Sequence, residues 1–211
     1  MIRRLLKTCL VFCGLGLAGT LGLMVLGAAA TEAHAQRSSI KIDETTNFYR
    51  ITGKSAGEFA ISMSKKGPYS RQHRRRAWAT ATRDMTYQLY HQKSKSRCTI
   101  KAVRVRMKIT YEMPKLASTR GVSSRQRKNW NRMYGLLNKH ERTHGLYYKQ
   151  FAKKVYASLR KMKPQRTCRA LEREAAKIVA KLGKEDKERN VTFDRRDRRN
   201  YRRMERIYSG A

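Results

Sequence analysis

Residues 123–161 read SSRQRKNWNRMYGLLNKHERTHGLYYKQFAKKVYASLRK, and this stretch decides the fold that we expect. Its large apolar residues recur every three or four positions, which is the spacing of one buried helix face. Ser123 followed by Gln126 is typical of a capping box, and Pro164 lies just beyond the other end. The sequence therefore predicts one long amphipathic helix. Its apolar face consists of Trp130, Met133, Tyr134, Leu137, Tyr148, Phe151, Val155 and Leu159.

Residues 140–144 of this helix spell HExxH, the most chemically specific pattern in the chain. Four residues make about one helical turn, so His140 and His144 project from one face and can both offer a nitrogen to one Zn²⁺. In zinc peptidases with this pattern the glutamate, here Glu141, takes a proton from a zinc-bound water that attacks a peptide carbonyl. The alternative is a basic surface helix with solvated histidines. The motif continues the apolar stripe, which favours the metal site.

The first 35 residues are typical of an export signal. A positively charged start precedes an apolar run over residues 8–30, and Ala33-His34-Ala35 ends the segment. The run is also long enough for an uncleaved membrane anchor. In both cases the chain from residue 36 onward would face the periplasm or the exterior. We therefore expect a periplasmic or secreted protein.

Two cysteines, Cys98 and Cys168, lie downstream of the signal. An even pair in an oxidising compartment predicts one disulfide. A metal site built on these cysteines is the alternative, but they are far apart in sequence and form no CxxC pair.

The chain is strongly basic. Subtracting Arg3, Arg4, Lys7 and Glu32 of the export signal from 50 basic and 15 acidic residues leaves 47 and 14, a net charge of +33. Such a field attracts polyanions without specifying which. After export, we expect lipopolysaccharide, peptidoglycan, anionic lipid or acidic polypeptides as partners, ahead of nucleic acid.

The segments before the long helix predict a small sheet. Residues 38–52 are consistent with one or two short strands, residues 54–66 with a short helix, and residues 77–91 with a strand. Residues 99–111 alternate apolar and basic side chains, which predicts a half-buried antiparallel strand with one cationic face. We expect an α+β domain in which a small antiparallel sheet packs on the HExxH helix and the helix after it.

A second helix is expected over residues 168–182, with Thr167 as its N-cap and Gly183 as its C-terminal signal. The domain would then span residues 36–183. Residues 184–211 would form a basic tail, either a helix that binds polyanions or a membrane surface, or a disordered or solvated segment.

Several motifs follow one another in a recognisable order. They are YRITG at 49–53, the threonine-rich segment with Trp78, Cys98, Tyr111-Glu112-Met113-Pro114, Trp130, HExxH, Cys168 and Phe193-Asp194. This order resembles a bacterial family of predicted secreted zinc-dependent proteases, catalogued as a domain of unknown function, over roughly residues 45–200. The resemblance implies a zincin-like domain, with His140 and His144 as ligands, Glu141 as general base and a Cys98–Cys168 bridge.

One stretch departs from that family's pattern. The pattern closes with an aromatic-aspartate pair followed by Thr-x-His-Gly, whereas residues 193–200 read FDRRDRRN, without the histidine. If that histidine is the family's third ligand, this chain binds zinc weakly or is a degenerate member. If the aspartate serves instead, Asp194 remains available.

A catalytic zinc usually has three protein ligands. Asp194 is the first choice for the third, from the resemblance, and Glu172 or Glu174 on the following helix is the second. The other histidines downstream of the signal, His73 and His91, are expected at the surface.

The predicted function is that of a secreted zinc-dependent peptidase, which hydrolyses peptides or proteins with a zinc-bound water activated by Glu141. Tyr147 or Tyr148 would stabilise the oxyanion. One alternative is a catalytically degenerate, cationic envelope protein that binds anionic surfaces or polyanions. Another is a zinc amidase that acts on cell-wall peptides.

Overall fold

The computed structural model describes residues 37–70 and 74–209. The predicted export signal, residues 1–35, and His73 lie outside the described residues. Within the described ranges, no helix is both long and apolar enough to cross a membrane.

The main sheet has three strands in the order β1-β5-β4: β1 (Ser39–Ile51), β4 (Thr80–Lys93) and β5 (Cys98–Leu116). β4 pairs antiparallel with β5, but β1 runs parallel to it. The sheet is therefore mixed, and the prediction of a purely antiparallel sheet was wrong. Alternating apolar residues indicate a strand with one buried face, but they do not indicate which way its neighbour runs.

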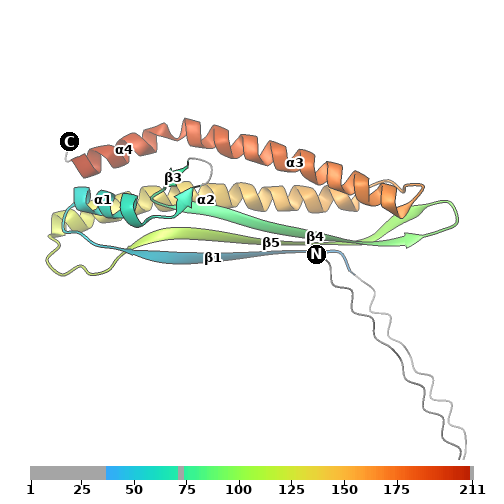
Figure 1. The fold of residues 1–211 in the computed structure, drawn as a ribbon, viewed down its shortest axis with the longest axis horizontal. Coiled ribbons are helices and arrows are strands. Elements are labelled where there is room, and N and C mark those ends of the chain that lie inside the picture. Colours follow the sequence, from blue (N-terminus) through green and yellow to red (C-terminus); the bar gives the residue numbers. More distant parts are fainter. Residues whose placement is uncertain (1–36, 71–73, 210–211) are drawn as a thin grey trace, which may run out of the picture. The chain divides into compact units, whose positions relative to one another are not determined.

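The helices lie on one side of this sheet, as Figure 1 shows. Between β1 and β4 the chain forms α1 (Ala56–Lys66) and a small hairpin of β2 (Tyr69–Ser70) and β3 (Arg75–Arg76). The central strand β5 buries every second side chain from Val103 to Met113, all in the core. The basic residues between them are on the opposite, open face, so the predicted half-buried strand with a cationic face is confirmed.

The predicted long helix is α2 (Ser124–Arg160), and its N-cap is confirmed. The Ser123 hydroxyl accepts a hydrogen bond from the Gln126 backbone N–H, but the Gln126 side chain accepts one from the Ala56 backbone N–H instead of closing a capping box. This contact joins the beginnings of α1 and α2. His140, Glu141 and His144 lie on the buried face of α2, as the helical phase predicted.

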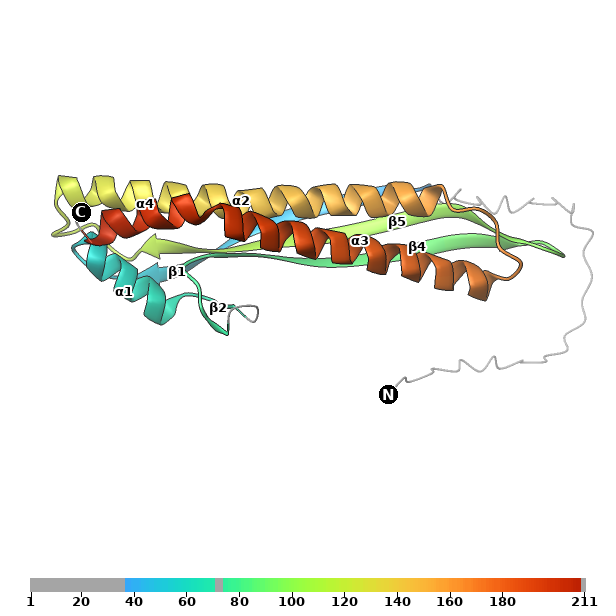
Figure 2. The same ribbon diagram turned by 90° about the horizontal axis from the view of Figure 1, so that it is seen from above.

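The next helix, α3 (Cys168–Arg196), begins at the predicted cap Thr167 but continues past Gly183. It is followed by α4 (Arg198–Ser209), whose Met204 and Ile207 join the hydrophobic core. The predicted helix end at Gly183 was therefore wrong, and residues 184–209 are packed helix, not a separate basic tail. A glycine inside a helix costs only about 1 kcal/mol, which tertiary contacts easily exceed. Figure 2 shows α3 and α4 alongside α2.

A disulfide joins Cys98, at the start of β5, to Cys168, at the start of α3. It confirms the predicted bridge and excludes the alternative of a metal held by the two thiolates in this oxidised form. His91 lies nearby, half-exposed, and contacts Glu172 of α3 at 3.2 Å. Because 70 residues separate the cysteines, the bridge is worth about 4 kcal/mol on the chain-entropy model.

Gly145 allows the sheet to approach α2 directly after the HExxH motif. A Cβ at this position would lie 1.8 Å from the hydroxyl oxygen of Tyr111 on β5. That hydroxyl donates a hydrogen bond to Glu44 of β1, which also pairs with Arg142 and Lys149 of α2. The glycine is thus required for packing between the helix and the sheet.

Candidate metal centre

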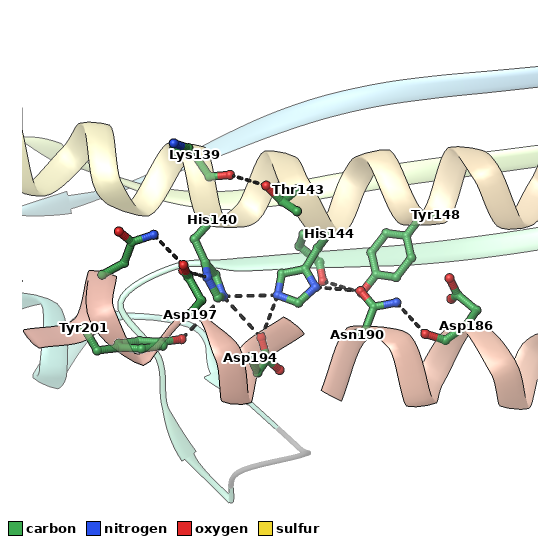
Figure 3. A network of polar contacts seen from close by, with 12 residues as sticks. Lys139, His140, Thr143, His144, Tyr148, Asp186, Asn190, Asp194, Asp197 and Tyr201 are labelled. Carbon is green, nitrogen blue, oxygen red and sulfur yellow. Dashed lines mark hydrogen bonds and ion pairs between the residues drawn. The ribbon is translucent and has the colours of Figure 1, made fainter. Parts of the chain in front are cut away.

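Three side chains bring their donor atoms together between α2 and α3 (Figure 3). The Nε2 atoms of His140 and His144 lie 3.1 Å apart. One carboxylate oxygen of Asp194, Oδ1, lies 3.3 Å from the first nitrogen and 2.9 Å from the second. These are the three residues that the sequence and the resemblance suggested as ligands.

The outer nitrogen of His140 is held by a carboxylate. Its Nδ1 lies 2.7 Å from Oδ2 of Asp197, whose other oxygen accepts a hydrogen bond of 2.6 Å from the Asn200 side chain. Since the carboxylate accepts, His140 donates from Nδ1. A proton at Nδ1 leaves Nε2 with a free lone pair in the neutral ring.

The outer nitrogen of His144 is held by an amide of known orientation. The Asn190 amide nitrogen donates to the Asp186 carbonyl oxygen at 2.7 Å, so its oxygen must face His144, at 2.6 Å from Nδ1. His144 therefore also donates from Nδ1. Both rings consequently present Nε2 to the same point as Asp194.

This donor set fits a zinc ion. Zinc–nitrogen bonds of about 2.0–2.1 Å with tetrahedral angles put two ligand atoms about 3.3 Å apart, close to the separations of 2.9, 3.1 and 3.3 Å found here. Two lone pairs and a carboxylate oxygen repel one another at such distances unless a cation or a proton lies between them. Outer partners that fix the histidine tautomer are a general property of metal sites.

The electrostatics of the cluster follow from its acids. Burial lowers the pKa of both histidines, but the hydrogen bonds to Asp194 and the charge of Glu141 raise them, and the balance is above the usual value. Burial raises the pKa of Asp194, but the two imidazoles lower it more, so that its pKa lies well below the ordinary range. The cluster thus favours positive charge at its centre.

Glu141 is buried beside the cluster, with 6% of its surface exposed. Its carboxylate accepts a hydrogen bond from the Ala81 backbone on β4. Burial raises the pKa of Glu141, and the neighbouring imidazoles only partly reverse this effect. A carboxylate with a raised pKa binds a proton more readily than an ordinary one, as a general base requires.

The two tyrosines that were candidates for oxyanion stabilisation make other contacts. The Tyr148 hydroxyl donates to the Ala81 carbonyl oxygen at 3.2 Å, and the Tyr147 ring packs edge-on against Phe193. A third tyrosine, which the sequence did not suggest, reaches the cluster: the Tyr201 hydroxyl of α4 lies 3.4 Å from His140 Nε2. Burial raises the pKa of Tyr201 to about 12, so it remains a proton donor at neutral pH.

The alternative third ligands lie elsewhere. Glu172 contacts His91, and Glu174 contacts Lys177, near the beginning of α3. At 1.5 Å per residue, about 30 Å of helix separates them from Asp194. Neither can join His140 and His144.

The residues that sequence reasoning missed follow a helical stripe. The polar side chains that face α2 recur every three or four positions from α3 into α4, which is the same spacing that reveals apolar faces. This spacing could have revealed the stripe once residues 184–201 were taken as helix. The stripe contains Asn190, Asp194, Asp197 and Tyr201, of which the sequence analysis had suggested only Asp194.

Residues 46–200 match the model of a family described as "Bacterial protein of unknown function (DUF922)". The chain belongs to this family. Comparisons with curated proteins and with solved structures found no match. The DUF922 match contains the three donor residues, Glu141 and both cysteines. It also contains the stretch 193–200, which lacks the expected histidine yet provides Asp194 and Asp197 to the cluster.

Proposed function

We propose that this protein is a zinc-dependent peptidase that acts after export. The observation that supports it is the convergence of two imidazole Nε2 atoms and one carboxylate oxygen within 3.3 Å, with both Nδ1 protons held by outer partners. A surface pair of histidines has no need for such outer partners. Zn²⁺ held by His140, His144 and Asp194 would supply Lewis-acid chemistry, polarising a carbonyl and acidifying water.

The surrounding residues take the remaining roles. Glu141 accepts the proton of the attacking water at its carboxylate and passes it to the leaving amine, for which its raised pKa is suited. Tyr201 donates its hydroxyl proton as a hydrogen bond to the oxygen on which negative charge develops. Asp197 and Asn190 hold the two imidazoles in one tautomer and orientation.

The sheet offers a way to align a substrate. β4 is an edge strand, and its Ala81 contacts both Glu141 and Tyr148. These contacts occupy the edge of β4 at Ala81, so an extended peptide would pair with neighbouring residues of this edge, close to the cluster. The predicted export signal and the disulfide are the basis for placing this activity in the periplasm or outside the cell.

The test combines metal analysis with hydrolysis. Purified protein that starts at Gln36 should contain about one zinc per chain and cleave an unstructured protein substrate. Glu141→Gln should keep the zinc and lose hydrolysis, and His140→Ala should lose both. His91→Ala is the matched control, because this histidine lies outside the cluster. A wild-type protein that binds no zinc, or undiminished hydrolysis by Glu141→Gln, would refute the proposal.

The alternative of a purely cationic binding protein is tested by salt. Binding of polyanions should weaken steeply as salt rises, whereas zinc stoichiometry should barely change. Digestion of cell-wall fragments, but not of proteins, would indicate the amidase instead.

A further inference from the structure

A second feature of α2 and α4 lies apart from the metal cluster. A surface hollow of about 730 Å³ is lined by the first half of α2 and by α4. Arg125 and Arg132 line it from α2, and Arg203 and Arg206 line it from α4. No acidic residue contributes to its lining, and none of the four arginines has an ion pair in the described part of the chain. We name this hollow the arginine groove.

Four positive charges around one hollow repel one another and are stabilised by a bound anion. The guanidinium group is planar and weakly hydrated, and it binds carboxylate and phosphate groups through two parallel hydrogen bonds. A hollow that concentrates positive charge also raises the local concentration of anions. The groove therefore has the charge and the donors of an anion-binding site.

The rest of the lining favours a polypeptide over an isolated phosphate. Asn129 and Asn131 carry amide groups, which both donate and accept hydrogen bonds as a peptide backbone requires, whereas a phosphate ion needs donors alone. Leu136 and Ile207 add apolar surface. At Gly135 no atom lies within 4 Å of the place where a Cβ would be, so the wall is open there. This mixture matches a peptide with acidic side chains.

The groove ends next to the candidate metal centre. Leu136 precedes His140 by four residues on α2, which is about 6 Å along the helix. On the other wall, Arg203 lies one helical turn after Asn200, whose side chain donates to Asp197, the outer partner of His140. A chain bound in the groove would therefore continue towards the cluster.

We propose that the arginine groove binds an acidic segment of a polypeptide and presents the adjoining residues of that chain to the His140–His144–Asp194 cluster. The presentation step rests on the proposed peptidase function, but acidic-peptide binding by the groove does not. The proposed substrate class is therefore polypeptides with a run of Asp or Glu beside the bond that is cleaved.

The binding test uses a fluorescent oligoglutamate peptide and the Glu141→Gln protein, so that no cleavage occurs. Arg203→Gln with Arg206→Gln should weaken binding about tenfold, because two exposed charge contacts are lost. The matched control is Arg169→Gln with Arg173→Gln, a pair exposed at the far end of α3 that removes the same charge. The control should change binding by less than about twofold. Arg125→Gln with Arg132→Gln should reproduce the loss from the opposite wall.

Two results of the binding test would refute the proposal that the groove binds an acidic polypeptide segment. Equal weakening by the α4 pair and by the control pair would mean that net charge alone attracts the peptide. Displacement of the peptide by inorganic phosphate at a lower concentration than by free oligoglutamate would make the groove a phosphate site. Thermal unfolding of each variant checks that the fold is retained.

Hydrolysis separates this inference from the proposed function. With zinc-loaded protein, the Arg203/Arg206 pair should raise KM for a substrate with acidic flanks and leave kcat and the cleavage of a neutral substrate unchanged. If cleavage depends neither on acidic flanks nor on the groove, the proposed role of the groove is refuted and the proposed peptidase function is not. If the groove binds acidic peptides but no peptide is cleaved, the proposed peptidase function is refuted and acidic-peptide binding by the groove is not.

Discussion

Two neighbouring regions between α2 and the last two helices carry opposite chemistry. At the candidate metal centre, Glu141, Asp194 and Asp197 surround two imidazoles, although acidic residues are only 15 of the 211 in the chain. About one helical turn away, the arginine groove has four arginines and no acid. Helix α2 therefore contributes to two adjoining regions of opposite charge, the candidate metal centre with α3 and the arginine groove with α4. The comparison shows that the local charge of each region depends on where the few acidic residues lie more than on the net charge of the chain.

The largest effect is expected from removing the carboxylate that both imidazoles contact. Asp194→Ala should weaken zinc binding by more than about 100-fold, because even outer partners of a metal site contribute 10–100-fold. Oligoglutamate binding should stay within about twofold. Zinc titration against a chelator measures the first and fluorescence anisotropy the second. Asp84→Ala, at an exposed position on β4, is the control. An equal loss of zinc affinity in this variant would contradict the assignment of Asp194 as a zinc ligand.

pH should separate the two regions next. The pKa of both histidines is raised above the ordinary histidine value of 6.5. As the pH falls, protons therefore begin to compete with zinc at a higher pH than they would for an ordinary histidine. Each imidazole that must lose a proton costs up to about tenfold in zinc affinity per pH unit below its pKa. Arginine stays charged throughout, so peptide binding by the groove should be flat from pH 6 to pH 8, provided that the glutamates are ionised. Zinc affinity that is constant over this range would contradict the assignment of the ligands.

A smaller effect is expected from the outer partner of His140. Asp197→Asn keeps a hydrogen-bond acceptor but removes its charge, and zinc affinity should fall about tenfold while one zinc per chain still binds at saturation. Glu205→Gln, an exposed acid on α4, is the control for the change in net charge. If both variants behave alike, the contact between Asp197 and His140 has no part in metal binding.

Substitution of Gly145 should have the smallest effect on zinc binding and on peptide binding. It should change the packing between α2 and the sheet instead. Gly145→Ala would push a methyl group into the Tyr111 hydroxyl and should lower the free energy of unfolding by about 1–3 kcal/mol in urea. Gly183→Ala meets no atom within 4 Å and should stabilise the helix by up to about 1 kcal/mol. Adding Tyr111→Phe should recover part of the loss. A neutral Gly145→Ala would show that the helix and the sheet separate easily here.

Local patterns predicted much of this fold. The stripe of α2, the caps Ser123 and Thr167, and the alternation of β5 all depend on residues within a few positions of one another, so the sequence reveals them. The inward orientation of His140 and His144 follows from the same phase. The parallel pairing of β1 and the continuation of α3 past Gly183 could not be predicted in this way. Both depend on partners that are distant in sequence.

The candidate site divides along the same line. The sequence by itself determined the paired imidazoles, the glutamate between them and the two cysteines, because a helical turn or an even count is enough to relate them. Only the tertiary structure brought Asn190, Asp197 and Tyr201 to those imidazoles and placed two arginine pairs around one hollow. Contacts between helices depend on how far each helix runs and which face it turns inward. That is decided by burial against the rest of the fold.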